Sequence, residues 1–257
     1  MKLLVKLGGT LLDEAASRDR LARELTAVSK RPGMQMAVVH GGGKQMTRFL
    51  AERGVESKFV DGLRVTTPDV IDAVLKVFAG SVNHTLVAAL VAAGSQAVGL
   101  TGIDASLTEA EQWSPELGAV GKPVRSNAAL LDLLTSNGYL PVVACVAGDK
   151  QGNIYNVNAD QMAASCAAGF SAARLLFLTD VPGVMDGAKQ ILPLLDRAAS
   201  ERLIRDGVAT GGMQAKLEAA HRALDGGVPE VVIAPGDEPD IVARLADGEK
   251  IGTRLVR

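Results

Sequence analysis

Two apolar runs that stop in glycines decide the fold, Val5-Lys6-Leu7-Gly8-Gly9 and Val38-Val39-His40-Gly41-Gly42-Gly43-Lys44. A buried strand that ends in this way presents bare backbone N–H groups at the carboxyl edge of a sheet, where open α/β sheets bind their ligands. Glycine lets the backbone approach an anion closely, and a helix that begins just afterwards adds its positive end. The two runs therefore predict that the chain binds a phosphate or a carboxylate in a crevice at the sheet edge.

Composition favours an enzyme over a nucleic-acid-binding protein. The 257 residues can form one large α/β unit or two lobes. They are 47% hydrophobic but only 3% aromatic, which favours close helix–sheet packing over stacking platforms for nucleobases. The 27 basic and 29 acidic residues give a net charge of −2, without the basic footprint of a nucleic-acid binder. Cys145 and Cys166 lack metal-like spacing, so we expect both to be reduced core residues.

The N-terminal residues 1–5 lead directly into a predicted strand and leave no room for a signal peptide. No apolar run approaches the roughly 18 uncharged residues that a membrane span needs. We therefore expect a cytoplasmic protein.

Hydrophobic periodicity predicts strands that alternate with helices. The continuous apolar run Leu3–Leu7 is typical of a parallel sheet covered on both faces, and Pro68 and Gly94 bound a long helix over 69–93. Further strands are predicted at 36–39, 97–99, 140–146, 174–179 and 230–233, and further helices at 17–29, 44–53, 128–137, 159–168, 198–206 and 213–224. Residues 61–67 and 149–152 indicate a short hairpin or loop and a hairpin turn, and the polar stretch 106–123 carries no specific motif. The alternation predicts an α/β fold, a three-layer αβα sandwich with an open, mostly parallel central sheet.

Several familiar chemistries are excluded. The chain has no Walker loop, no G-x-G-x-x-G, no G-x-S-x-G elbow and no H-E-x-x-H. Its three histidines, His40, His84 and His221, lie in unrelated segments. We expect His40 to be a packed or hydrogen-bonded core residue, and the other two to lie at the surface or at an interface.

Two polar segments point to a small anionic ligand. In Gly62-Leu63-Arg64-Val65-Thr66 the arginine can bind a carboxylate with two parallel hydrogen bonds, although this stretch alone slightly favours a surface salt bridge. The run Asn156-Val157-Asn158-Ala159-Asp160-Gln161 directs two amides and a carboxylate to one side of a strand end that becomes a helix. Helix capping could explain Asn158 or Asp160, but not the whole run.

Two later segments indicate a nucleotide. The strand that ends in Leu178-Thr179-Asp180-Val181-Pro182-Gly183-Val184 has a turn suited to a nucleotide, although a plain β-turn explains it equally well. Thr210-Gly211-Gly212-Met213-Gln214-Ala215-Lys216 opens a helix with glycines and places Lys216 in its first turns. Taken singly, such a lysine is more often solvated.

Together these segments resemble the motifs of the amino-acid kinase family, in the family's order and over essentially the whole chain. K-x-G-G at Lys6–Gly9 and G-G-M-x-x-K at Gly211–Lys216 mark the wider family. The Gly62–Thr66 and Asn156–Asp160 segments narrow the resemblance to the branch whose acceptor is N-acetylglutamate.

The resemblance implies an N-terminal lobe, residues 1–169, that holds the acyl acceptor and forms a homodimer, and a C-terminal lobe, residues 170–257, that binds ATP. Mg²⁺ would be bound mainly through the nucleotide phosphates, with no metal ligand from the chain. The γ-phosphoryl group would pass to the side-chain carboxylate of N-acetyl-L-glutamate in arginine biosynthesis. Because that carboxylate is ionised at neutral pH, the reaction needs no general base and depends on in-line positioning and charge neutralisation.

The same resemblance implies the roles of individual residues. Lys6 and Lys216 would stabilise the transferring phosphoryl group, and Asp160 would orient both lysines. Phosphate would be bound by Gly8, Gly9 and Gly41, and the acceptor by Gly42, Gly43, Arg64, Asn156 and Asn158. The nucleotide would contact Thr179, Asp180, Val181, Pro182, Gly183, Val184, Met185, Val208, Ala209, Thr210 and Gly212.

The chain starts at its first strand and lacks the N-terminal helix of arginine-inhibited hexameric relatives. We therefore expect a dimer formed across the helix 69–93 and no arginine feedback.

Three alternative functions stay open at this point. A kinase of carrier-protein-linked aminoadipate or glutamate would need a basic surface near Arg64, and no dense basic run lies there. A family member acting on carbamate or uridylate is disfavoured by Arg64 and Asn156. A non-catalytic amino-acid-binding module is disfavoured because binding alone needs neither both lysines nor Asp160.

Overall fold

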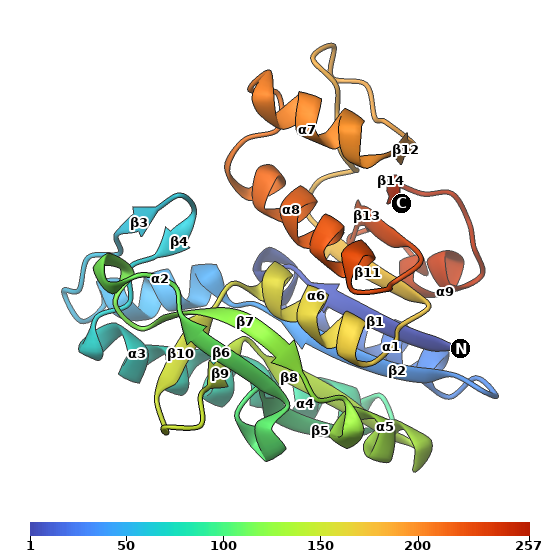
Figure 1. The fold of residues 1–257 in the computed structure, drawn as a ribbon. Coiled ribbons are helices and arrows are strands. Elements are labelled where there is room, and N and C mark those ends of the chain that lie inside the picture. The colour runs from blue at the N-terminus through green and yellow to red at the C-terminus, as the bar shows by residue number, and fades with distance from the viewer.

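Strand β1 (Lys2–Leu7) lies in the interior of an eight-stranded sheet in the computed structural model, which describes residues 1–257 (Figure 1). Leu3, Leu4, Val5 and Leu7 are fully buried, so this strand packs on both faces, as its continuous apolar run predicts. Its two neighbours, β2 (Gln35–His40) and β11 (Arg174–Thr179), both run parallel to it.

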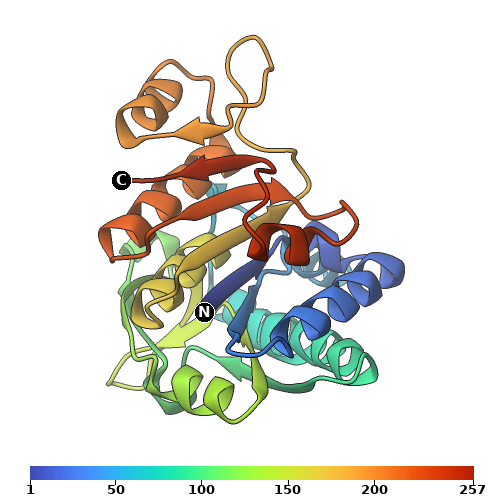
Figure 2. The same cartoon turned by 90° about the vertical axis from the view of Figure 1, so that its right-hand side faces the viewer.

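The sheet has the strand order β12-β14-β13-β11-β1-β2-β8-β5. The strands not yet introduced are β5 (Gln96–Thr101), β8 (Tyr139–Ala144), β12 (Leu194–Leu195), β13 (Val231–Pro235) and β14 (Thr253–Leu255). Only β13 and β14 pair in the antiparallel sense, so the predicted open, mostly parallel sheet is confirmed. Figure 2 shows the red C-terminal strands continuing the sheet of the blue β1, so no break in the sheet marks residue 169, and the division into two lobes stays a prediction.

Helices cover both faces of the sheet and complete the predicted three layers. One face carries α1 (Ala15–Ser29), α2 (Gly43–Ala51), the long helix described below and α9 (Ile241–Ala246). The other carries α5 (Ala129–Ser136), α6 (Ala159–Gly169) and α8 (Gly211–Asp225), with α7 (Arg197–Arg205) packed on α8. A single buried apolar cluster of 65 residues joins the three layers, which gives the sheet its rigid edges.

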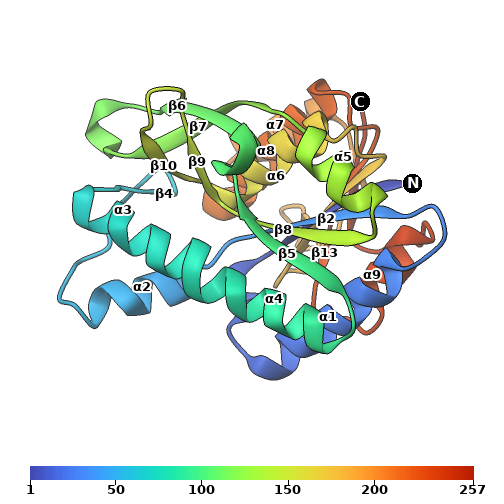
Figure 3. The same cartoon turned by 90° about the horizontal axis from the view of Figure 1, so that it is seen from below.

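The predicted long helix is present but changes its winding along its length. It consists of α3 (Pro68–Val74), a π-helical segment Leu75–Val82 and α4 (Asn83–Ala92), and it runs beside α2 and α1 (Figure 3). Thr67 caps its first turn by accepting a hydrogen bond from the Val70 amide. Nothing in the sequence predicts the π-helical turns, which are uncommon and occur frequently at functional sites.

The expectation that no segment approaches the composition of a membrane span is wrong for this helix. Pro68–Ala92 has 25 residues and a mean hydropathy of 1.6 over its most apolar 18-residue window, enough by length and composition alone to cross a membrane. Buried core helices meet the same criteria. Here the helix packs against α1, α2, β5 and β8, and Asn83 in its middle is buried. This packing buries 39% of the apolar window.

A second, small sheet closes on itself beside the main one. Its strands are β6 (Thr108–Gln112), β7 (Val120–Ser126), β9 (Val146–Gly148) and β10 (Ile154–Val157), in the order β10-β7-β6-β9. The polar stretch without a motif, 106–123, forms two of these strands. The predicted turn at 149–152 is confirmed and joins β9 to β10. The predicted hairpin near 61–67 is confirmed as β3 (Phe59–Val60) and β4 (Leu63–Arg64).

Other element predictions need correction. The strand predicted over 140–146 is two strands, because β8 ends at Ala144 and β9 begins at Val146. The C-terminal strands β12 and β14 and the six-residue helix α9 were not predicted, since each is too short to show a clear period.

Gly99 packs so closely on Asn83 that adding a single methyl group at position 99 should destabilise the fold. A Cβ at Gly99 would lie 2.1 Å from Asn83 Oδ1, and Asn83 cannot swing away without losing its hydrogen bonds to His40 Nε2 and the Val142 carbonyl, each 2.9 Å long. We predict that Gly99→Ala lowers the free energy of unfolding by about 1–3 kcal/mol. Urea denaturation followed by circular dichroism measures the change. Gly187→Ala, where a Cβ meets no atom, is the matched control and should change it by less than about 0.5 kcal/mol; equal effects of both variants would contradict the prediction.

Candidate active site

Asp160 holds two lysines that come from distant parts of the chain. Lys6 at the end of β1 places Nζ 2.7 Å from Asp160 Oδ1, and Lys216 in α8 places Nζ 3.1 Å from Oδ2. Asp160 lies in the first turn of α6, where Asn158 Oδ1 accepts hydrogen bonds from the Asp160 and Gln161 amides at 2.9 and 3.3 Å. The structure therefore brings the three predicted catalytic residues together, and Asn158 caps the helix that positions Asp160.

The charge balance of this group suits an anionic ligand. Burial alone would raise the pKa of Asp160, but the charges of Lys6 and Lys216 outweigh it and hold that pKa below its usual value. One carboxylate thus lies between two ammonium groups, and the three side chains carry a net charge of +1. The side chains are only 6%, 7% and 15% exposed for Lys6, Asp160 and Lys216, so water screens this charge weakly.

The two glycine-rich strand ends meet directly. A Cβ on Gly9 would lie 3.1 Å from the Gly43 nitrogen and 3.3 Å from the Gly42 nitrogen, so a side chain at this position would push the loops apart. Gly43 begins α2, and the first N–H groups of a helix have no partner within the helix. The backbone nitrogens of Gly42 and Gly43 therefore lie close to Gly9, and the N–H groups of these glycines are available to a ligand as a set of donors.

Two of the predicted phosphate-binding glycines have other hydrogen-bond partners. The Gly8 amide donates to the Leu178 carbonyl at 2.9 Å, and the Gly41 amide lies 3.4 Å from the Leu7 carbonyl. Gly8 thereby joins the first glycine loop to the end of β11, and Gly41 packs on Ala159 at the start of α6. In this structure these two glycines permit close backbone approach rather than offering free donors.

A cavity of about 150 Å³ opens next to the glycine donors, and every predicted acceptor-binding residue lines it. These residues are Gly42, Gly43, Arg64, Asn156 and Asn158. The cavity also has apolar walls, none of whose residues was predicted as a site residue, formed by Phe59, Leu63, Phe78, Val120, Cys145, Val157 and Ala159. The grouping of cationic, amide and apolar side chains suits a small molecule with a carboxylate and an acyl group.

Arg64 is a buried residue and does not form a surface salt bridge. Its side chain donates to Thr47 Oγ1 at 2.9 Å, to the Gly43 carbonyl at 3.2 Å and to Ser57 Oγ, and its guanidinium lies 4.6 Å from the centre of the Phe59 ring. Burial lowers the pKa of Arg64 from its usual value. No carboxylate of the protein neutralises this cation, so an anionic ligand in the cavity would be its counter-ion.

Asn156 is fixed in the cavity wall by the small sheet. It pairs with Val120 of β7 and donates from Nδ2 to Thr66 Oγ1 at 3.1 Å. The backbone of Thr66 in turn bonds to the Leu117 and Ala119 backbones. The stretch 106–123, to which no role was assigned from the sequence, thus joins the Arg64 hairpin to the Asn156 strand.

A wider cleft of about 490 Å³ leads from this region to the start of α8. The hairpin residues Val60–Leu63 line one side, and Gly211, Gln214 and Ala215 line the other. Trp113 and Gln161 also line the cleft, and neither was predicted as a site residue. No motif surrounds Trp113, and the sequence around Gln161 indicates only the capped start of a helix.

The predicted nucleotide-contacting segments lie around the end of β11 and the start of α8. Thr179 ends β11 and donates to Asp180 Oδ1 at 3.1 Å, while Thr210 directly precedes α8. Val184 and Ala209 are buried within the core, so contact between them and a nucleotide would have to go through their backbone. The N-terminus of the 15-residue helix α8 adds unpaired N–H groups at this end of the cleft.

His40 is a buried, hydrogen-bonded core residue, as predicted. Burial lowers its pKa to about 4, so the ring is neutral at physiological pH. Asn83 Nδ2 lies 2.9 Å from Nε2, and the Gly41 carbonyl lies 2.9 Å from Nδ1. Because the carbonyl only accepts, Nδ1 carries the proton. His84 lies at the surface, as predicted, whereas His221 on α8 is only 6% exposed and is not a surface residue.

A model of the amino acid kinase family matches residues 1–235. The acetylglutamate kinase of Solibacter usitatus is 65% identical over 256 residues, covering 100% of this chain and 99% of that protein. The acetylglutamate kinase of Mesorhizobium japonicum is 40% identical over 268 aligned residues, covering 99% of this chain and 90% of that protein.

Among solved structures, N-acetylglutamate synthase from Neisseria gonorrhoeae, complexed with coenzyme A and N-acetyl-glutamate, superposes with a TM-score of 0.87. The sequence identity is 23%, and the superposition covers 100% of this chain and 59% of the synthase. A likeness at this identity shows the fold alone, and it confirms the α/β architecture.

The lowered pKa of Asp160 predicts how acid affects stability. The folded-state pKa lies below the unfolded value of about 3.9, so the ion pairs stabilise the fold fully above that pH, and this contribution is lost as the pH falls through the folded-state pKa. Asp160→Asn leaves both lysines without a counter-ion and should cost on the order of 3–5 kcal/mol near neutral pH. Urea titrations at neutral pH and between about pH 4 and pH 1 should show variant and wild type converging in acid. A difference that does not depend on pH would contradict this account.

Proposed function

The chain belongs to the amino acid kinase family, and we propose that it transfers the γ-phosphoryl group of ATP to the side-chain carboxylate of N-acetyl-L-glutamate. The product is N-acetyl-L-glutamyl 5-phosphate, an intermediate of arginine biosynthesis. One observation carries the proposal: Asp160 gathers Lys6 and Lys216 where the glycine donors, the acceptor cavity and the start of α8 meet. The two relatives named for this activity support it, and the alignments cover 99% and 90% of their own lengths.

The chemistry fits a site without a general base. A carboxylate oxygen of the acceptor attacks the γ-phosphorus, the bond from that phosphorus to the bridging oxygen breaks, and ADP leaves as an anion. No proton has to be removed from the acceptor, because its carboxylate is already ionised at neutral pH. The lysines can neutralise charge on the transferring group from two sides, and the glycine N–H groups can donate to its oxygens.

We assign the acceptor's non-reacting groups to Arg64 and Asn156. The α-carboxylate would be the counter-ion that Arg64 lacks, and the acetamido group would bond to the Asn156 amide. The apolar walls of the cavity would then cover the acetyl methyl group and the methylene chain. An acceptor held at these points directs its second carboxylate toward the glycine donors and the lysines.

We place the nucleotide along 179–185 and 208–212, with its phosphates at the start of α8. No group of three or more acidic, histidine or cysteine side chains that could hold a metal ion occurs in the structure, so Mg²⁺ would be held by the phosphate oxygens of ATP. When bound there it neutralises phosphate charge. Lys6 and Lys216 supply the positive charge that the chain itself contributes.

We further propose a cytoplasmic homodimer formed across the helix Pro68–Ala92. In support, Val91 on this helix is 53% exposed, and β5 beside it is an edge strand of the main sheet. Val91→Lys should shift the sedimentation coefficient toward that of a monomer. Val124→Lys, at a 57% exposed position on β7 of the small sheet, is the matched control and should leave the dimer intact. A wild-type monomer would contradict the proposal.

The proposed activity is tested by ADP release coupled to hydroxylamine trapping of the acyl phosphate. We expect N-acetyl-L-glutamate to give both ADP and the hydroxamate. Glutamate, aspartate, aminoadipate and UMP, run as alternative acceptors, should give neither above background. Comparable turnover with aminoadipate or UMP would move the chain to another branch of the family, and ADP release without hydroxamate would refute the acyl phosphate.

Lys6→Ala and Lys216→Ala should each lower kcat by on the order of a hundredfold or more, since each removes a donor used in the transition state. The fold should persist in both variants, which circular dichroism checks. Lys150→Ala changes a lysine that is 71% exposed in the β9–β10 turn and serves as the control with unchanged kcat. Near-normal turnover of either site variant would overturn the assignment.

Arg64→Ala should raise the KM for N-acetyl-L-glutamate far more than the KM for ATP, because the α-carboxylate does not react and is bound alike in the ground and transition states. Arg64→Lys should recover only part of the loss, since a point charge cannot reproduce the two-pronged guanidinium contact. Steady-state kinetics with each substrate varied in turn measures both constants. An unchanged acceptor KM in Arg64→Ala would remove Arg64 from the site.

A further inference from the structure

His40 is the last residue of β2 and lies directly before the three glycines of the second loop. Its side chain is fully buried, and both ring nitrogens have hydrogen-bond partners inside the protein. Nδ1 lies 2.9 Å from the carbonyl oxygen of Gly41. That carbonyl belongs to the same peptide group as the Gly42 N–H. His40 therefore contacts one end of a peptide group whose other end is among the donors available to a ligand.

The contact decides where the Gly42 N–H points. A trans peptide group directs its carbonyl and its N–H in opposite directions, and the chain has no cis peptide bond. Because Nδ1 holds the Gly41 carbonyl toward His40, the Gly42 N–H points away from His40. This N–H donates to no acceptor of the protein. It is therefore free to donate to a phosphate oxygen.

The glycines themselves do not fix this orientation. Gly41 and Gly42 both lack the Cβ that restricts the backbone of other residues, so steric contacts permit the peptide group between them to turn over. A turned-over peptide group would place the Gly41 carbonyl, an acceptor, where the Gly42 donor now lies, and an acceptor there repels an anion. The hydrogen bond from His40 Nδ1 is the one that this peptide group forms within the protein. It selects the orientation that favours an anion.

Asn83 fixes which ring nitrogen of His40 carries the proton. Asn83 Nδ2 lies 2.9 Å from the Val142 carbonyl oxygen and 2.9 Å from His40 Nε2. Because the carbonyl can only accept, the amide atom between these two partners is the nitrogen, and it donates one hydrogen to each. His40 Nε2 therefore accepts. Burial lowers the pKa of His40 to about 4, so the ring is neutral and its single proton lies on Nδ1, facing Gly41.

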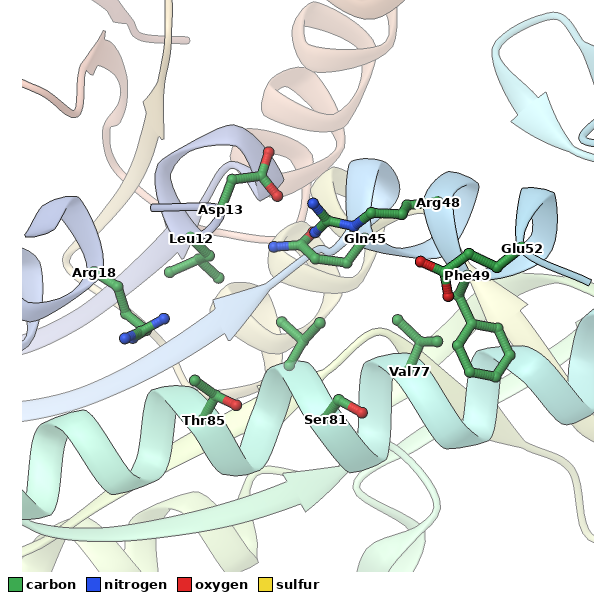
Figure 4. Close-up of a pocket in the computed structure, with 11 residues that line it drawn as sticks. Leu12, Asp13, Arg18, Gln45, Arg48, Phe49, Glu52, Val77, Ser81 and Thr85 are labelled. Carbon is green, nitrogen blue, oxygen red and sulfur yellow. The ribbon is translucent and has the colours of Figure 1, made fainter. Parts of the chain in front are cut away.

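The long helix that carries Asn83 is packed against the glycine loop. Figure 4 shows this helix, labelled at Ser81, passing below α2, which is labelled at Gln45 near its start. A Cβ on Gly42 would lie 3.0 Å from Phe78 of the same helix. No space separates the helix from the loop, so Asn83 and the histidine that it holds stay at a fixed distance from the glycines.

We propose that His40 is a positioning residue for phosphoryl transfer, and that it holds the peptide group between Gly41 and Gly42 so that the Gly42 N–H faces the transferring phosphoryl group. The ring touches neither substrate and takes no proton from them. This role rests on the proposed function, because it concerns the group that is transferred. It gives a core histidine an effect on kcat that acts through the backbone of the glycine loop.

Two amide variants separate the two hydrogen bonds of the ring. In His40→Asn the amide nitrogen is bonded to Cγ, as Nδ1 is, so it can still donate to the Gly41 carbonyl but cannot reach Asn83. In His40→Gln the amide lies one bond further out, so it can reach Asn83 but not the Gly41 carbonyl. We expect kcat to fall about tenfold or more in His40→Gln and less than about threefold in His40→Asn, with both KM values changed by less than about threefold.

Steady-state kinetics with N-acetyl-L-glutamate and ATP measures these constants. The matched controls are His221→Asn and His221→Gln, at a buried histidine of α8 whose Nε2 has no hydrogen-bond partner, and both should leave kcat unchanged. A histidine that only supports the core would not distinguish the two variants in kcat. Equal kcat values in the two His40 variants, or a larger loss in His40→Asn than in His40→Gln, would overturn the inference.

The proton position of wild-type His40 is a readout that needs neither turnover nor a variant. NMR spectra of the ring nitrogens at neutral pH should show Nδ1 protonated and Nε2 unprotonated, and a proton on Nε2 would overturn the inference. This readout decides if thermal melts show that the variants do not fold. A wild type that does not phosphorylate N-acetyl-L-glutamate would count against the proposed function. Crystal structures of the variants would then decide the role of His40, since the Gly41 carbonyl should keep its orientation in His40→Asn and turn over in His40→Gln.

Discussion

The charge of Asp160 is the constraint on which the rest of the site depends. Two lysine ammonium groups repel each other, and without an anion between them they would not stay together in a poorly screened site. Asp160 holds both through separate oxygens, and Asn158 fixes the helix turn that carries it. The two lysines and Asp160 together carry one excess positive charge, which can stabilise a phosphoryl group as it moves from one substrate to the other.

The fold brings this group together because each member lies at the end of a rigid element. Lys6 is the last but one residue of β1, Asp160 lies in the first turn of α6 and Lys216 lies in the second turn of α8. Helix α6 packs on both β1 and α8 (Figure 1). Parallel strands deliver all their carboxyl ends to one edge of the sheet, so both glycine loops and the end of β11 reach the same place. The small closed sheet adds one wall of the acceptor cavity. This wall carries Asn156 and is hydrogen-bonded to the Arg64 hairpin through Thr66.

Sequence was sufficient where a residue's role depends on neighbours in the chain. The strand β11, the glycine loops and the starts of the helices that carry Asp160 and Lys216 follow from apolar runs, glycine positions and capping residues. It failed where the role depends on partners far away in the chain. The π-helical turns, the closure of the small sheet and the cavity walls at Phe78, Val120 and Cys145 arise from packing between distant segments, which no local pattern records. The Gly8 amide is a mixed case, since its sequence context predicts a free donor and the approach of Leu178 supplies an acceptor.

The most direct test of the central claim is a crystal structure with a non-hydrolysable ATP analogue and N-acetyl-L-glutamate bound together. The account predicts the γ-phosphate between Lys6 and Lys216, with both Nζ atoms about 3 Å from its oxygens, and the acceptor's α-carboxylate on Arg64. It also predicts the adenosine along 179–185 and 208–212. An analogue whose phosphates and base all lie over His40–Gly43, with none of it near Asp180, would contradict the account.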